Sequence, residues 1–192
     1  MNAKAPRAMH TPVLRGTRAV LRPFKQSDIE ARVGLGQDAD INRMFGGVPT
    51  WSGVRELTEA AARAWYDHVT TDGNPLHWAI DGDEGVIGTA RLHGLDEHDR
   101  RARYAIGILD GSLLGRGLGQ DVTLSVLRHA FGDLGLHRVD LRVLAFNERA
   151  IDCYRQCGFI EEGRERESVR IGDEWHDDII MGVLAGEMSS LL

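Results

Sequence analysis

A short glycine-rich segment in the second half of the sequence has the composition of an anion-binding turn. Leu114 precedes it, and its own residues are Gly115, Arg116, Gly117, Leu118, Gly119 and Gln120. Glycine has no side chain, so the backbone of such a turn can approach a ligand closely. Apolar residues recur at helical spacing from Leu118 onward, so the turn would open a helix whose first amides and dipole favour an anion. A diphosphate suits these donors, and Arg116 can add a charge-assisted hydrogen bond.

The amino-acid sequence of this turn does not match two common phosphate-binding loops. A P-loop needs a lysine followed by Ser or Thr after its last glycine, whereas Gln120-Asp121 follows here. A Rossmann turn needs a third small residue, and the position falls on Gln120 or Val122. A tight turn between a strand and a helix, with no ligand, remains an alternative.

A second polar cluster lies further along the chain, where Asn147 can cap a short helix that ends near Cys157 and Gly158. Tyr154 lies within this helix. Cys153 and Cys157 are four residues apart, which places both on one helix face, where a disulfide would strain the backbone. We therefore expect two reduced thiols, and two cysteines are too few for a metal site.

The elements around these clusters follow from hydrophobic periodicity and turn residues. Alternation predicts strands at residues 18–23, 76–80, 86–92, 103–109, 138–145, 159–168 and 175–184. Helical spacing predicts helices that begin at Ser27 or Asp28, extend from Val54 to Val69, begin at Gly117, and extend from Asn147 to Cys157. Residues 34–53 form a polar, glycine-containing stretch. The strand–helix–strand order of the second half implies a parallel pair, whereas short links make the strands of 76–109 antiparallel. The predicted fold class is α/β with a mixed sheet.

The composition is that of one soluble domain. The chain has 192 residues, of which 42% are apolar and 27% charged, and a single core is the default at this length. We expect a flexible leader at residues 1–12, one domain at 13–185 and a tail at 186–192. The formal net charge of -6 disfavours nucleic acid and anionic membranes and favours cationic partners such as amines. The first ten residues contain no apolar run for a signal peptide or anchor, so a cytoplasmic location is expected.

The order of these motifs resembles the GNAT acetyltransferase superfamily, and most closely its RimJ/RimL-like branch. The matching segments are the glycine turn 115–119, residues 136–143, residues 147–151 with Tyr154, residues 157–159, and residues 172–177 with Met181. The resemblance extends over residues 13–184 and is densest from Gly107 onward. It implies the GNAT acyl-CoA N-acyltransferase fold, with about seven strands in a mixed, twisted sheet and about four helices.

The resemblance also implies roles for individual residues. The glycine turn would bind the pyrophosphate of acetyl-coenzyme A. The strand ending near Ile108 and Leu109 would splay from its neighbour and bond the pantetheine arm through its backbone. Asn147 matches the asparagine that contacts this arm, and Tyr154 matches the tyrosine beside the thioester sulfur. A tyrosine with a pKa of about 10 stays protonated at neutral pH and can protonate a thiolate whose thiol has a pKa of roughly 8.5. This chemistry requires no metal.

Two positions depart from the family pattern. Leu114 stands where relatives often have Gln or Arg, so a side-chain contact is lost while the backbone donors remain. Ala105 stands where many relatives have a glutamate as general base. The candidates left for the base are His93, Asp110, Asp177 and an ordered water, which can suffice for an α-amine with a pKa of about 7.7–8.0.

The resulting hypothesis is an N-acetyltransferase that moves the acetyl group of acetyl-CoA to a primary amine by direct attack, with Tyr154 as general acid. The acceptor stays open among a protein N-terminus, a lysine, a polyamine and an amino sugar. Its pocket is expected between residues 40–50 and the last hairpin, where Trp51 and Trp65 are candidates for the lining, although core positions suit both better. The alternatives are a non-catalytic acyl-CoA-binding sensor or assembly subunit, and a structural domain. Nothing in the sequence decides whether the chain forms a homodimer.

Overall fold

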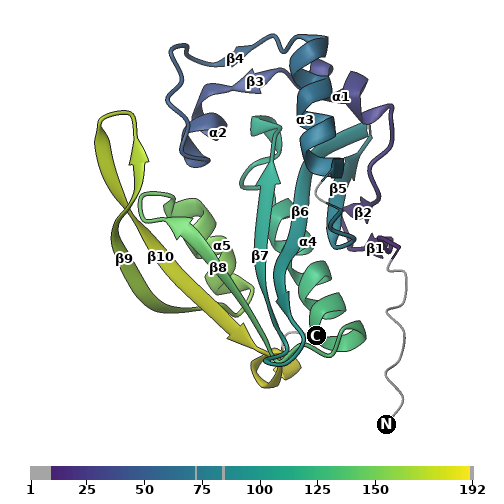
Figure 1. Cartoon of the computed structure of the whole chain (residues 1–192), viewed down its shortest axis with the longest axis vertical. Coiled ribbons are helices and arrows are strands. Elements are labelled where there is room, and N and C mark those ends of the chain that lie inside the picture. The colour runs from purple at the N-terminus through teal and green to yellow at the C-terminus, as the bar shows by residue number, and fades with distance from the viewer. Residues whose placement is uncertain (1–9, 72, 84, 191–192) are drawn as a thin grey trace.

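The structure is a computed structural model and describes residues 10–71, 73–83 and 85–190 (Figure 1). Within these residues one sheet has eight strands in the order β1-β2-β5-β6-β7-β8-β10-β9, and β3 and β4 form a separate pair. The strands of the large sheet are β1 (Leu14–Arg15), β2 (Val20–Arg22), β5 (His77–Gly82), β6 (Gly85–Asp96), β7 (Arg101–Ile108), β8 (Arg138–Leu144), β9 (Ile160–Ile171) and β10 (Glu174–Leu184). The pair consists of β3 (Gln37–Asp38) and β4 (Val54–Arg55). Neighbouring strands are antiparallel, except that β7 and β8 are parallel.

Helices connect these strands and cover the sheet. The α-helices of the described residues are α1 (Asp28–Leu35), α2 (Ala39–Met44), α3 (Glu59–Thr71), α4 (Leu118–Arg128) and α5 (Glu148–Gln156). Three shorter helical segments are η1 (Gly111–Leu113), the π-helical turn η2 (His129–Asp133) and η3 (Ala185–Ser190). α1 packs against α3 and β6, and Figure 1 shows α3 in front of the sheet and α4 behind it.

The main core lies between the sheet and α4. Trp78 of β5, Val122 and Val126 of α4, Leu141 of β8 and Met181 of β10 are all completely buried and belong to one cluster. Helical spacing on α4 and alternation on the strands bring these side chains to a shared interface, where the removal of apolar surface from water stabilises the fold. This interface holds the first turn of α4 at a fixed position against β7.

The two parallel strands separate after a short paired stretch. β7 and β8 pair only from Arg101 with Arg138 to Arg103 with Asp140. The Arg103 Nε donates to Asp140 Oδ1 at 2.8 Å, at the last paired position. Beyond it β8 stays paired with β10 as far as Leu144, while β7 follows β6, and Figure 1 shows the two strands diverging. The strand pairing therefore leaves a gap in the middle of the sheet.

The mixed α/β fold and the antiparallel pairing of the middle strands agree with the sequence prediction. The large sheet has eight strands and the described residues contain five α-helices, against about seven strands and about four helices expected. The segment predicted as the tail contains η3, and Met188 in it is buried in the core. Residues 1–9 of the expected leader, and residues 191–192 at the other end, lie outside the described residues.

In the first half of the chain one predicted helix boundary is wrong and one helix was not predicted. The helix expected from Val54 begins at Glu59, because residues 54–55 pair with residues 37–38 and the Thr58 Oγ1 caps the helix by accepting from the Ala61 amide at 3.2 Å. The polar stretch 34–53 contains α2, a six-residue helix too short to show periodicity. Asp38 caps this helix, since its Oδ1 accepts from the amides of residues 40 and 41 at 2.8 and 3.0 Å.

Candidate functional site

A cavity of about 610 Å³ occupies the gap between β7 and β8. This volume lies within the range of small-molecule sites, roughly 300–1,000 Å³. Its walls come from α2 and the residues after it, from β7, from the turn before α4, from β8 and from α5, with one residue each from β9 and β10. Segments far apart in the sequence thus meet around one space.

The glycine turn forms the wall of this cavity at the start of α4. Gly115 and Gly117 have φ angles of 73° and 78°, in the left-handed region that glycine adopts without strain. Among the described residues, no group accepts a hydrogen bond of normal geometry from the amides of residues 115–120, whereas the next amide, of Asp121, donates to the Gly117 carbonyl at 3.1 Å. Unpartnered amides at a helix N-terminus form an anion site, so the turn fits a diphosphate.

Asp121 fastens the segment between β1 and β2 to this turn. Its Oδ1 accepts from the Thr17 amide and hydroxyl, both at 2.8 Å, and its Oδ2 accepts from the amides of Arg18 and Ala19 at 2.9 and 3.0 Å. Burial raises the pKa of the Asp121 carboxyl, but the hydrogen bonds outweigh burial and lower the pKa overall. The Arg18 Nε consequently lies 3.8 Å from the point that a Cβ on Gly117 would occupy. Arg18 is a second cation beside the turn, and the sequence analysis missed it because more than one hundred positions separate it from Asp121.

The residues expected to bind the coenzyme divide into those that line the cavity and those that do not. The lining includes Ile108, Leu114, Gly115, Gly117, Gly119, Gln120, Asn147 and Tyr154. Leu118 is buried in the core instead, and Arg116 is exposed outside the cavity wall. The Leu109 amide donates to the Ile87 carbonyl at 2.8 Å, so it is not available to a ligand.

The backbone of β7 presents an unpaired edge to the cavity. Since Leu109 bonds to β6, alternation in the antiparallel ladder turns the amides and carbonyls of Ile106 and Ile108 toward β8. β8 pairs with β7 only as far as Arg103 and Asp140, so these groups have no strand partner. An extended ligand with amide groups can add to such an edge as a strand would. This is the arrangement that the resemblance implies for the pantetheine arm.

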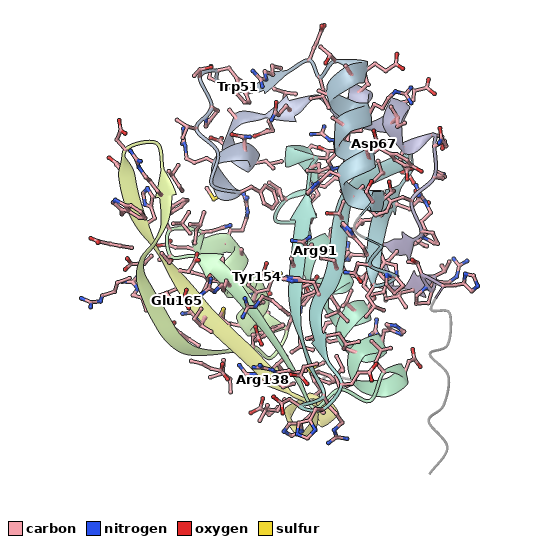
Figure 2. The ribbon with its side chains drawn as sticks, viewed as in Figure 1. Trp51, Asp67, Arg91, Arg138, Tyr154 and Glu165 are labelled. Carbon is pink, nitrogen blue, oxygen red and sulfur yellow. The ribbon has the colours of Figure 1, made fainter. Side chains whose placement is uncertain are left out.

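Asn147 and Tyr154 lie on the opposite side of the gap, at α5. The Asn147 Oδ1 caps α5 by accepting from the Ala150 amide at 3.3 Å, which leaves its side-chain NH₂ group for a ligand. Tyr154 lies one to two turns further along α5, and Figure 2 labels it beside the gap between β7 and β8. Burial raises the pKa of the Tyr154 hydroxyl, with smaller effects from Cys153 and Cys157. The hydroxyl therefore stays protonated well above neutral pH and can serve as an acid.

The three side chains considered as general bases lie outside the lining of this cavity. His93 borders a separate polar cavity beside Asp140, where burial, Arg91 and Arg103 lower the pKa of its imidazole. The Asp110 Oδ1 caps η1 by accepting from the Ser112 amide and hydroxyl at 2.9 and 2.7 Å. The Asp177 Oδ1 accepts from the Glu167 amide at 2.8 Å, and its Oδ2 lies 3.4 Å from Arg164. The two aspartates thus have local structural partners.

The two tryptophans considered for the acceptor pocket also lie outside the cavity lining. The Trp51 Nε1 donates to the Gln37 carbonyl at 3.2 Å, and the Arg55 guanidinium stacks 3.5 Å from its ring centroid. The Trp65 ring packs edge-on against the Phe24 ring, with 6.0 Å between the ring centroids. Figure 2 shows Trp51 at the end of the molecule beyond α2, away from Tyr154. Both rings therefore support the α1–α3 region.

The side of the cavity away from the glycine turn contains residues that the sequence analysis did not select. Phe45 follows α2, and its ring would lie only 2.7 Å from a Cβ placed on Gly107 of β7, so it covers this glycine closely. Val169 of β9 and Asp178 of β10 complete this wall. The only sequence signal for Asp178 is an acidic residue directly before an apolar strand run, which does not reveal where the side chain points. We call this wall the acceptor side, and the wall formed by the glycine turn, the β7 edge and α5 the coenzyme side.

Within the described part of the chain, no group of three or more His, Cys, Asp or Glu side chains is placed to hold a metal ion. None of the helices in residues 10–71, 73–83 and 85–190 is long and apolar enough to cross a membrane.

A split mixed sheet, a turn with unpartnered amides before the helix that follows β7, and a buried tyrosine at the gap are features that suit a coenzyme A-dependent acyltransferase. The chain belongs to the GNAT acetyltransferase family, because the family described as "Acetyltransferase (GNAT) domain" matches residues 18–160. The protein is therefore an acetyltransferase of the family that uses acetyl-CoA.

Similar proteins agree with this assignment. The chain is 26% identical over 181 residues to the "Probable N-acetyltransferase YjcK" of Bacillus subtilis, covering 90% of this chain and 97% of the relative. It is 30% identical over 157 residues to a spermidine N(1)-acetyltransferase of Vibrio cholerae, covering 82% of this chain and 87% of the relative.

Solved structures share the fold at lower identity. A GNAT-family acetyltransferase from Bacillus anthracis superposes with a TM-score of 0.75 at 18% identity, covering 92% of this chain and all of the other. The spermidine N-acetyltransferase of Vibrio cholerae in complex with CoA and spermine superposes with a TM-score of 0.69 at 21% identity, covering 89% of this chain and 98% of the other.

Proposed function

We propose that the protein is an N-acetyltransferase of the RimJ/RimL-like branch that moves the acetyl group of acetyl-CoA to a primary amine. The proposal treats residues 13–185 as one GNAT domain. It places the enzyme in the cytoplasm, where free thiols such as Cys153 and Cys157 stay reduced. The partners are acetyl-CoA and the amine, and the acidic net charge of -6 argues against nucleic acid and membranes as partners.

One observation carries the proposal: Gly115, Gly117, Gly119 and Gln120, whose amides are unpartnered among the described residues, border the same cavity as Tyr154. In this proposal the amides and the nearby Arg18 and Arg116 hold the pyrophosphate. The edge of β7 at Ile106 and Ile108 bonds the pantetheine arm, and the Asn147 side-chain NH₂ contacts it from the other side. These contacts fix the thioester between β7 and Tyr154.

The chain's own groups then perform the transfer. The amine nitrogen forms a bond to the thioester carbonyl carbon, and a backbone amide of β7 stabilises the negative charge that develops on the oxygen. The carbon–sulfur bond breaks, and Tyr154 donates its proton to the leaving sulfur. The nitrogen loses its excess proton to water, and solvent reprotonates Tyr154. No covalent bond to the protein forms at any step.

The proposed acceptor is a primary amine, and its chemical class is not narrowed further here. Some relatives are named for spermidine, which supports an amine acceptor without selecting a polyamine over a lysine, a protein N-terminus or an amino sugar. The formal net charge of -6 also favours a cationic acceptor.

Two measurements on the purified protein test the proposal. Acetyl-CoA at about 100 times its dissociation constant should raise the free energy of unfolding by roughly 2.7 kcal/mol, visible as a higher melting temperature. Addition of primary amines from a panel should then release free CoA thiol in step with acetylated product. An unchanged melting temperature contradicts coenzyme binding, and stabilisation without thiol release on any amine favours the acyl-CoA-binding sensor.

A further inference from the structure

One carboxylate on the acceptor side is buried and has no partner among the described residues. Asp178 of β10 is 7% exposed and lines the cavity. No donor or cation within the described ranges forms a hydrogen bond or ion pair with it, although a buried carboxylate is costly to leave unpaired. An ordinary acidic residue at this depth is paired, so the position indicates a ligand that supplies the missing charge.

The strand register fixes the neighbours of Asp178. Leu144 of β8 and Glu165 of β9 are its direct cross-strand partners, and Ile180, two residues on, is paired with Arg142. Cross-strand partners point to the same face of a sheet, so Asp178, Leu144, Glu165 and Arg142 share one face. Arg142 and Leu144 line the cavity as well, which identifies this face as the acceptor side.

The other charged side chains on this face already form ion pairs. Arg142 forms an ion pair with Glu165 across β10, and Figure 2 labels Glu165 on β9. Asp140 is paired with Arg103 at 2.8 Å. Arg142 is therefore paired with a carboxylate other than Asp178. The Asp178 carboxylate remains available to a ligand in the cavity.

The remaining walls beside Asp178 are apolar. Leu144, Met44, Phe45 and Val169 all line the cavity. The loop after α2 approaches β9 closely, since a Cβ on Gly46 would lie 3.9 Å from a Val169 methyl group. Such walls suit a hydrocarbon stem. The other carboxylate in the cavity lining, that of Asp152, is already paired with Arg155 at 3.2 Å. A second cationic group along the stem would therefore find no further unpaired carboxylate in the lining that the structure describes.

We infer that Asp178 binds the acceptor's ammonium group and that the acceptor is a single primary ammonium on an apolar stem. The inference deepens the proposed function, on which it rests for the identity of the cavity's second substrate. Asp178 acts as an anchor, because a carboxylate is a far weaker base than an alkylamine and does not take the proton from the ammonium group. The proton leaves to water before the nitrogen attacks.

A pair of probes that differ only in charge tests the anchor. Binding of 1-hexylamine and of 1-hexanol to the CoA-saturated protein would be measured by calorimetry. The unaltered protein should bind the amine at least 10-fold more tightly than the alcohol, because a buried charge-assisted bond is worth at least this factor. Asp178→Asn should reduce the preference to about threefold or less, and Asp178→Glu should retain part of it.

Asp173→Asn is the matched control, since this residue lies in the turn of the same hairpin with an almost fully exposed side chain. It removes the same charge and should leave the preference and the affinity for CoA unchanged. Full preference in Asp178→Asn, or no preference in the unaltered protein, would overturn the inference. Binding of spermidine much more tightly than of 1-hexylamine would overturn the single-ammonium part.

The thiol-release assay separates this inference from the proposed function. If 1-hexylamine is acetylated, Asp178→Asn should raise its KM about 10-fold or more with little change in kcat, because an anchor holds the acceptor equally in the ground state and the transition state. Amine binding that depends on Asp178 without thiol release would contradict the transferase proposal alone. Transfer to amines that is unaffected in Asp178→Asn would contradict the anchor alone.

Discussion

The coenzyme side and the acceptor side of the cavity are built in different ways. The coenzyme side uses mostly backbone groups, namely the amides of residues 115–120 and the edge of β7 at Ile106 and Ile108, together with the Asn147 and Tyr154 side chains at α5. The acceptor side uses side chains from α2, β8, β9 and β10, with Asp178 as its unpaired charge. Backbone donors are common to any sequence that folds this way, whereas side chains change with every substitution. The difference explains how one coenzyme site can accompany many acceptors.

The largest effect on acetyl-CoA affinity is expected from Gly117→Val, which disturbs the backbone conformation of the glycine turn. Gly117 has a φ angle of 78°, a conformation that costs an L-residue about 1–2 kcal/mol and a β-branched residue more. The lost amide bonds to phosphate add roughly 1.5–3 kcal/mol. The dissociation constant for acetyl-CoA should rise about 100-fold or more, measured by calorimetry.

Two further variants keep that experiment interpretable. Gly34→Val places the same side chain in α1, where a Cβ meets nothing within 4 Å, and should leave the affinity for acetyl-CoA unchanged. Gly117→Ala tests the strain with a smaller side chain and should give an intermediate loss. Normal acetyl-CoA affinity in a folded Gly117→Val protein would show that the turn does not hold the coenzyme.

Tyr154→Phe separates catalysis from binding on the coenzyme side, because it removes the proposed proton donor and leaves the groups that bind acetyl-CoA. Loss of a general acid should slow thiol release about 100-fold, while the dissociation constant for acetyl-CoA changes less than about threefold. Because burial raises the pKa of Tyr154, the unaltered enzyme should show no loss of rate from tyrosine ionisation as the pH rises to about 10, the usual tyrosine pKa.

Tyr66→Phe is the matched control, because Tyr66 lies in α3 outside the cavity lining. This variant should retain full turnover. Turnover of Tyr154→Phe equal to that of the unaltered enzyme would assign the proton donor to water and would remove the tyrosine from the mechanism.

Asp121→Asn tests a side chain that holds the backbone of residues 17–19 beside the glycine turn. An amide accepts fewer of the four hydrogen bonds from residues 17–19 and sets its NH₂ group against their donors. We expect a loss of about 2 kcal/mol in the free energy of unfolding, measured by urea denaturation at pH 7.

The pH dependence of this loss provides a check on its cause. The pKa of Asp121 is lowered in the folded state, so its contribution is complete above the unfolded pKa of about 3.9 and disappears as the pH falls through the lowered folded pKa. The difference between the two proteins should therefore be constant from pH 5 to 8 and shrink below about pH 4. A difference that persists unchanged at pH 2–3, where both proteins remain folded, would assign it to packing.

Arg116→Ala should have the smallest effect, because an exposed cation contributes little to an anion site built from backbone amides. Arg116 is exposed and outside the cavity lining, and exposed ion pairs are worth about 0.2–1 kcal/mol. The dissociation constant for acetyl-CoA should rise less than about fivefold at 0.15 M salt. A loss as large as that of Gly117→Val would mean that side chains dominate this side as well.

The same contrast accounts for what the sequence could predict. The turn 115–119, the Asn147 cap and the Tyr154 helix are local patterns, so their elements follow from neighbouring residues. Their place in one cavity was implied by the family resemblance and agrees with the cavity lining. The separation of β7 and β8 came from the family resemblance and agrees with the register. Arg18 and Asp178 were missed because their positions depend on contacts between distant segments. Asp177 was considered as a general base, whereas its neighbour Asp178, which lines the cavity, was not considered. Adjacent residues on a strand differ in which face they reach.

One binding experiment tests directly whether the two sides are separately built. The dissociation constant for acetyl-CoA would be measured by calorimetry for the unaltered protein, Gly117→Val and Asp178→Asn, each confirmed as folded by thermal unfolding. The account predicts a rise of about 100-fold or more in Gly117→Val and a change of less than about twofold in Asp178→Asn. Equal losses in both variants, or no loss in Gly117→Val, would contradict it.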